Sequence, residues 1–165
     1  MSLSNRRSIL IAGAALLLSS ACNFSPVYGP EGAGSKLEGR ILFDAPDSRD
    51  EYILVRQLET RLGRADPAPM SLTYSVSNSS SSLGTTATGS TTRLHRYGSL
   101  SYTLKNTATG ETITTGSFRN FAAYSATSNT AATLASERAA SERLMTLLAD
   151  QLVDRLNLLD PALLP

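Results

Sequence analysis

Apolar and polar residues alternate along four stretches of the chain, at 37–43, 70–77, 93–105 and 111–122. The alternation is cleanest at 70–77, where each apolar residue is followed by a serine or threonine. A period of two sends successive side chains to opposite faces of a β-strand. The four stretches therefore predict strands that bury one face and leave the other, rich in hydroxyl groups, in contact with water.

A helix is predicted between the first two of these strands. Ser48 and Glu51 have the spacing of a capping box, and apolar residues then recur on one helical face at 55–62. Gly63 follows as a residue that favours a left-handed helix end. The prolines that come after it prevent the helix from continuing.

A second helix is predicted from about 130–133 to about 158. An alanine or leucine occupies every fourth position from Ala140 to Leu156, and charged residues occupy the other side. Arg138 and Glu142 are one turn apart, so we expect them to form an ion pair on the exposed side. Pro161 then stops the helix.

Residues 77–92 hold eleven serines and threonines in sixteen positions, together with two glycines. This composition fits either a mobile loop or the ends of a long hairpin, and the sequence leaves both open. A turn at 106–110, with a glycine at its end, joins the last two strands. The order strand, helix, three strands, helix predicts a single α+β domain over 37–160, with a four-stranded, largely antiparallel sheet and two amphipathic helices packed on one face.

The first 21 residues have the pattern of a signal peptide that is removed on export. Arg6 and Arg7 precede an apolar run at 9–18, and three small residues at 19–21 lead to Cys22. The run is shorter than the stretch of about 20 apolar residues that crosses a bilayer. The paired arginines leave two export routes open, the general secretory route and the twin-arginine route.

Cys22 is the only cysteine in the chain, and it stands directly after the small residues. This position resembles the bacterial lipobox, in which the thiol receives a diacylglycerol and becomes the mature N-terminus, although Ser19 replaces the usual leucine. We therefore expect lipid attachment at Cys22, with acyl chains such as palmitate. Residues 22–36, which contain Pro26, Pro30 and three glycines, are predicted to form a flexible tether between the lipid and the fold.

Composition and charge argue against several kinds of chemistry. Fifteen basic and fourteen acidic residues give a net charge of +1, which disfavours a nucleic-acid-binding protein. A single cysteine and a single histidine exclude cysteine-based zinc clusters and multi-histidine metal sites. No G-x-S-x-G motif is present, and His95 is expected to be an exposed strand residue and not a catalytic base. We therefore expect no enzyme activity, no cofactor and no metal.

Four segments of the chain carry a resemblance when they are taken together. They are 22–29 at the expected mature N-terminus, the helix face at 55–62, the strand that begins at Arg93 and continues through Leu100, Tyr102 and Leu104, and the helix at 139–156. Their order and spacing resemble the lipopolysaccharide-assembly lipoprotein family LptE, over almost the whole expected mature chain.

The resemblance implies a partner and a location. LptE sits as a plug inside the outer-membrane β-barrel LptD and helps to deliver lipopolysaccharide to the outer leaflet. The chain would then be anchored by lipid in the outer membrane and face the periplasm or the barrel lumen. Asn23, the residue after the cysteine, is compatible with that membrane.

The resemblance also implies residues that contact lipopolysaccharide. In the family a basic residue at the start of the third strand has this role, and by spacing it corresponds to Arg93. Arg96 is a second candidate, although a regular strand directs it to the opposite face. The family's other basic contact, before the last helix, has no counterpart because 122–136 contains neither lysine nor arginine. This leaves Arg119 as a substitute.

Two other functions stay open at the level of sequence. The first is a periplasmic lipoprotein scaffold for envelope assembly that does not bind lipopolysaccharide. The second is a lipid-anchored hydrolase, which the lack of a nucleophile motif weakens. Co-purification with a barrel protein would separate the plug from the scaffold.

Overall fold

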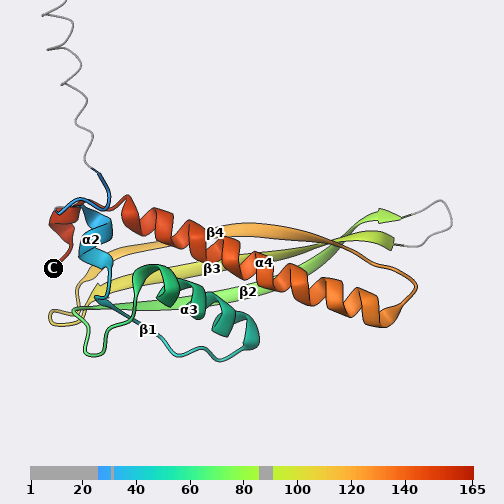
Figure 1. Cartoon of the computed structure of the whole chain (residues 1–165), viewed down its shortest axis with the longest axis horizontal. Helices are drawn as coiled ribbons and strands as arrows, with labels where there is room; N and C mark the ends of the chain where they lie inside the picture. Colours follow the sequence, from blue (N-terminus) through green and yellow to red (C-terminus); the bar gives the residue numbers. More distant parts are fainter. Residues whose placement is uncertain (1–25, 31, 86–90) are drawn as a thin grey trace, which may run out of the picture.

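The computed structural model describes residues 26–30, 32–85 and 91–165. The predicted signal peptide, its cleavage site and Cys22 therefore lie outside the described residues. Within them, a sheet of order β1-β2-β3-β4 is covered on one face by helices α3 and α4 (Figure 1). The elements in chain order are α2 (Ala33–Leu37), β1 (Ile41–Phe43), α3 (Arg49–Leu62), β2 (Met70–Thr85), β3 (Thr91–Asn106), β4 (Thr112–Ser125), α4 (Thr130–Asn157) and the 3-10 helix η2 (Pro161–Leu163). The predicted α+β fold is confirmed.

Three long strands form the antiparallel part of the sheet. Leu104 of β3 lies opposite Leu72 of β2, and Leu100 lies opposite Phe118 of β4. These four residues are buried beneath the helices, so the even-numbered positions of β2, β3 and β4 face the helices and the odd-numbered positions face away. The exception is the start of β4, where a register shift turns Ile113 toward the core. The short strand β1 runs parallel to β2. The sheet is therefore largely antiparallel, as predicted.

The described part of the hydroxyl-rich stretch at 77–92 extends the two strands, and residues 86–90 lie outside the described residues. β2 continues to Thr85 and pairs with β3, which begins at Thr91. The side chains at 78–82 are all exposed. The apolar alternation stops before them because both faces of β2 are polar and open to solvent there.

The first predicted strand is shorter than expected. Residues 37–43 were predicted to be extended, but β1 is confined to Ile41–Phe43, and Leu37 is the last residue of helix α2. Gly39, with φ of 63°, makes the turn between the two elements. Glycine adopts that left-handed conformation without steric cost, which is why the chain reverses at this position.

The tether predicted at 22–36 is wrong in its last four residues, which belong to α2 and to the packed domain. Ala33 is 3% exposed and is part of the core. Lys36 donates from Nζ to the carbonyl oxygen of Pro161 at 3.0 Å, which joins α2 to the C-terminal segment. A Cβ at Gly34 would lie 2.8 Å from the Tyr28 ring, so glycine lets this segment fold closely on itself.

Both long helices begin where their capping residues indicate. Ser48 Oγ accepts a hydrogen bond from the N–H of Glu51 at 3.2 Å, and α3 ends at Gly63, whose φ is 72°. Asn129 caps α4, because its side-chain oxygen accepts from the N–H groups of the second and third residues of the helix. None of the described helices combines the length and the apolar character that crossing a membrane requires.

The central part of α4 covers the core. Leu144 and Leu148 are fully buried against the sheet. Directly beneath them is Gly98 of β3, where a Cβ would lie 3.0 Å from Leu148 Cδ1 and 3.1 Å from Leu144 Cδ2. The absence of a side chain at Gly98 therefore allows α4 to approach β3 closely.

We predict that Leu148→Asp destabilises the domain by about 3 kcal/mol or more, because it places an unpaired charge in this apolar layer. The matched control is Leu147→Asp, one residue earlier, where the side chain is 43% exposed. Urea unfolding followed by circular dichroism gives the free energy of unfolding of both variants. Equal loss in the two variants would contradict the assignment of the buried face.

Candidate functional site

The face of the sheet away from the helices has a distinctive chemistry. We call it the open face, and it consists of the odd-numbered positions of β2 and β3, and of β4 from Thr115 onward, whose side chains are described. Hydroxyl side chains predominate, the formal positive charges are Arg93, Lys105 and Arg119, and none of these positions carries Asp or Glu. Its residues are Ser71, Thr73, Ser75, Ser77, Ser79, Ser81, Arg93, His95, Tyr97, Ser99, Ser101, Thr103, Lys105, Thr115, Ser117, Arg119, Phe121, Ala123 and Ser125.

Three aromatic rings gather on the open face toward the hairpin tip. His95 stacks on Phe121, with ring centroids 4.7 Å apart and an interplanar angle of 17°. Tyr97 lies opposite Phe121 in the register, and its Oη is 3.4 Å from His95 Nδ1. Phe121 remains 49% exposed. These three rings form an aromatic cluster that is surrounded by hydroxyl side chains.

Arg119 extends the aromatic cluster along β4. Its guanidinium carbon lies 5.9 Å from the centroid of the Tyr97 ring, and its Nε donates to Ser99 Oγ at 3.2 Å. The alternation along β3 and β4 did not predict this aromatic cluster. One sequence feature could have indicated the cluster. The rings at 95 and 97 occupy odd positions of the strand, whereas its apolar residues occupy even positions.

The structure separates the three arginines that the family resemblance singled out. Arg93 is exposed on the open face, whereas Arg96 points to the helices, as the strand periodicity predicted. Arg93 lies opposite Ser125 and Arg119 opposite Ser99, so they are six positions apart along the sheet. At about 3.3 Å per residue this is about 20 Å, and the three side chains form no common site.

The comparisons with known proteins agree with the family resemblance found in the sequence and with the fold. The family model LptE, described as lipopolysaccharide-assembly, matches residues 40–156. The chain belongs to the LptE family. Membership implies a role in lipopolysaccharide assembly at the cell envelope, and the family is one of non-catalytic assembly lipoproteins.

Solved structures of lipoproteins share the fold of this LptE-family chain. A lipoprotein from Caulobacter crescentus is 20% identical, with a TM-score of 0.63 over 76% of this chain and 92% of that one. A minor lipoprotein from Acinetobacter baumannii is 17% identical, with a TM-score of 0.57 over 72% and 90% of the two chains. Lipoprotein B from Nitrosomonas europaea is 11% identical, with a TM-score of 0.57 over 73% and 83%. A comparison with curated proteins found no match.

Arg96 is the centre of an ion-pair network on the covered face. Its guanidinium contacts Asp50 of α3 and Glu137 of α4, each at 3.1 Å, and only 19% of its side chain is exposed. Asn78 of β2 donates to the same Asp50 carboxylate at 2.7 Å. The network therefore connects both long helices to two strands of the LptE fold.

Two further ion pairs connect α3 to α4. Arg49 contacts Glu142 at 3.2 Å, and Arg61 contacts Asp150 at 2.7 Å. The predicted pairing of Glu142 with Arg138 within α4 is therefore wrong, because the Glu142 carboxylate is directed to α3. Helical spacing identified a neighbour on the same helix and could not reveal the closer arginine on the other one.

A tyrosine and several acids lie at the start of α3 on the same side of the sheet. Burial raises the pKa of the Tyr74 hydroxyl to about 12, and the carboxylates of Glu51, Asp44 and Asp47 add to the shift. The hydroxyl thus remains protonated and donates to the carbonyl oxygen of Asp44 at 3.3 Å. In the described part of the chain, no group of three or more His, Cys, Asp or Glu side chains is placed to hold a metal ion.

We predict that Arg96→Leu lowers the free energy of unfolding by about 1–3 kcal/mol, because it leaves the half-buried carboxylates of Asp50 and Glu137 without their cation. Arg93→Leu, on the same strand but on the open face, should change it by less than about 0.5 kcal/mol. Chemical denaturation of both variants measures the difference. Equal effects would show that the network contributes nothing beyond the side chains' surface packing.

Proposed function

We propose that this LptE-family lipoprotein plugs and stabilises an LptD-type outer-membrane β-barrel and assists lipopolysaccharide assembly at the outer leaflet. The open face is the observation that carries the proposal. The lumen of a large membrane β-barrel is polar, and a hydroxyl-rich surface forms hydrogen bonds with such a wall and its water. Among the described residues, the acids that would repel an anionic ligand lie elsewhere, on the helices and in the loops.

Arg93 and Arg119 are the residues that we propose for contact with lipopolysaccharide phosphates. Both lie on the open face, and a guanidinium binds phosphate through two parallel hydrogen bonds. Their separation means that they would engage different groups of the ligand. Arg96 supports this role poorly, because two carboxylates already neutralise its charge on the covered face.

The proposed anchor is a lipid on Cys22, placed before the described residues. The segment already contacts the packed domain at Val27 and Tyr28, because the N–H of Gly34 donates to the Val27 carbonyl oxygen at 3.0 Å and Asn157 Nδ2 donates to Tyr28 Oη at 3.3 Å, so only about four residues separate the lipid from the fold. At about 3.3 Å per residue this short stretch reaches at most about 17 Å. The domain would therefore stay close to the membrane surface in which the barrel opens.

We predict that mature protein carries a diacylglyceryl group on Cys22 and that Cys22→Ala abolishes it, because the thiol is the only group at that position able to form the thioether. Mass spectrometry of the N-terminal peptide gives the result directly. A mature protein with an unmodified Cys22 would refute the lipid anchor, and Ser25→Ala serves as a control that leaves the thiol in place.

We predict that Arg93→Glu weakens lipopolysaccharide binding by about tenfold or more and makes it less sensitive to salt, since a hydrogen bond to a charged group contributes about 1.5–3 kcal/mol. Lys105→Glu makes the same charge change on the same strand and face, twelve positions away. Binding of purified lipopolysaccharide to each variant, measured at two salt concentrations, separates a local contact from a general loss of charge.

The barrel is tested in the same variants by pull-down from detergent-solubilised outer membrane. Wild type, Arg93→Glu and Lys105→Glu should all retain the barrel protein, because one exposed arginine is a small part of a plug's surface. If the wild type retains no barrel, the plug is refuted and the periplasmic scaffold is favoured. If it retains the barrel but Arg93→Glu binds lipopolysaccharide normally, the plug stands and the Arg93 contact is refuted.

A further inference from the structure

The outer edge of β4 is available for pairing. β4 is the last strand of the sheet, and β3 occupies its inner edge. In an antiparallel ladder the main-chain groups of alternate residues point to opposite edges. Arg143 Nη2 donates to the carbonyl oxygen of Ala123 at 3.0 Å, and the N–H of Phe121 donates to Asn120 Oδ1 at 2.9 Å. The odd-numbered residues of β4 therefore direct their N–H and C=O groups outward.

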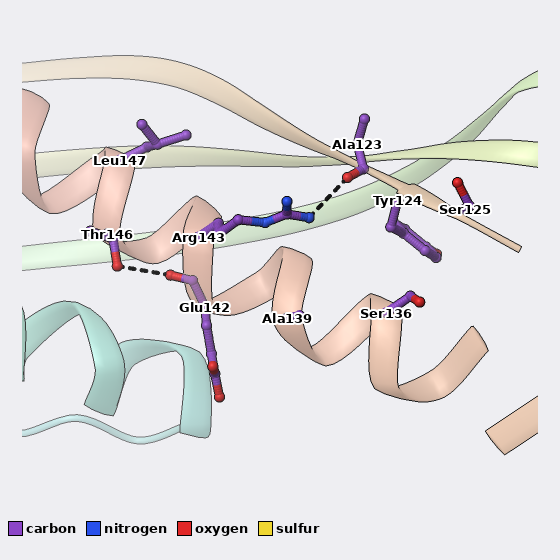
Figure 2. Close-up of a pocket in the computed structure, with 9 residues that line it drawn as sticks. All are labelled: Ala123, Tyr124, Ser125, Ser136, Ala139, Glu142, Arg143, Thr146 and Leu147. Carbon is purple, nitrogen blue, oxygen red and sulfur yellow. Dashed lines mark hydrogen bonds between the residues drawn. The ribbon is translucent and has the colours of Figure 1, made fainter. Parts of the chain in front are cut away.

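A groove runs beside this edge, between β4 and α4 (Figure 2). Its volume is about 820 Å³, and Tyr124, Ala139 and Leu147 supply much of its apolar lining. Glu142 also lines the groove, but its carboxylate is paired with Arg49 of α3. Figure 2 shows Arg143 reaching from α4 to Ala123, while Glu142 points to the other side of the helix. The groove thus combines an apolar floor, an unpaired strand edge and one guanidinium held over a carbonyl.

The charges that border the edge are positive. Arg143 reaches Ala123, and the Arg155 guanidinium carbon lies 4.7 Å from the centroid of the Phe118 ring, whereas the Arg119 side chain leans inward over Tyr97 and Ser99 of β3. The acids of this part of α4 are directed elsewhere. Glu142 and Asp150 pair with arginines of α3, and Asp154 borders a hollow beside Tyr28.

We propose that the outer edge of β4 and the α4–β4 groove bind an extended, acidic segment of a partner protein by strand addition. The segment's main chain would pair with the outward groups of β4 between Thr115 and Ala123. Side chains on one face of the added strand would enter the groove against Leu147, and those on the other would continue the open face beside Arg119. Carboxylates are the groups that complement Arg143 and Arg155.

Arg143 has a distinct part in this binding. Without a partner it occupies the Ala123 carbonyl and shields the edge, as polar side chains do on natural edge strands. When the segment pairs with Ala123, the guanidinium is released to contact a carboxylate of the segment. A second copy of this chain is a poor occupant, because two β4 edges would bring Arg143 and Arg155 of each copy against one another.

The test uses full-length lipidated protein in detergent and a fluorescein-labelled peptide of alternating valine and glutamate. Fluorescence anisotropy should show saturable binding. A peptide of the same sequence with alternate amides N-methylated, and one with lysine in place of glutamate, should each bind at least about tenfold more weakly. In hydrogen exchange, the outward N–H groups of Ser117 and Arg119 should become protected by the acidic peptide.

Two variants locate the site on the protein. Ser117→Pro removes an outward N–H without removing a bond to β3 and should reduce binding at least about tenfold. Arg143→Gln should reduce it several-fold, whereas Arg138→Gln, which removes a charge from the opposite side of α4, should leave it unchanged. Circular dichroism checks the fold of Ser117→Pro. If Ser117→Pro does not fold, the peptide affinity of Arg143→Gln tests the proposal.

Three outcomes would overturn the proposal. Equal binding of the N-methylated peptide would show that charge alone attracts it, and equal binding of the lysine peptide would show that the arginines have no part. If no peptide binds, Arg143 serves only to shield the edge. The same conclusion follows if Arg143→Gln forms a dimer in light scattering. None of these results bears on retention of the barrel or on lipopolysaccharide binding, so the function proposed above fails or stands independently.

Discussion

Burial of a single face of the sheet is the constraint on which the rest of this structure depends. Beyond the irregular start of β4, the even-numbered positions of β2, β3 and β4 pack against α3 and α4, and the odd-numbered positions face away from them. A slip of one residue in the register would exchange the two faces. It would put Arg93 and Lys105 against the helices and Leu100 and Leu104 in solvent. The hydroxyl groups and cations are therefore gathered on one surface by the packing of the core on the other.

That constraint weakens toward the hairpin tip, where β2 is polar on both faces. Two sets of contacts specify the register there. On the covered face Arg96 binds Asp50 and Glu137, and on the open face Tyr97 lies opposite Phe121. Partly buried ion pairs and aromatic cross-strand pairs both depend on which residues meet. Asp50 also stands in the first turn of α3, where a carboxylate is favoured by the helix dipole.

The parts of the fold that could be predicted are those that local pattern determines. The alternation at 70–77 identified β2, and the capping box at Ser48 and Glu51 fixed the start of α3. Helix α2 was not predicted, because five residues, three of them small, give no helical period. The parallel pairing of β1, the partners of Arg96 and the aromatic cluster depend on residues far apart in the sequence. The open face was predicted as a hydroxyl-rich surface. Which strand forms its edge, and which rings meet on it, can be seen only from the strand register.

The odd-numbered residues of β4 belong both to the open face and to the outer edge of the sheet. At the odd-numbered positions of β4 the side chain points to the open face while the main chain points outward, so Arg119 belongs to both surfaces. A strand added at this edge would widen the open face by about 4.8 Å and leave the side chains of β3 uncovered. Arg93, on β3 and six positions from Arg119 along the sheet, would keep its access to a ligand. The geometry therefore allows a partner at the edge and a ligand on the face to be bound at the same time.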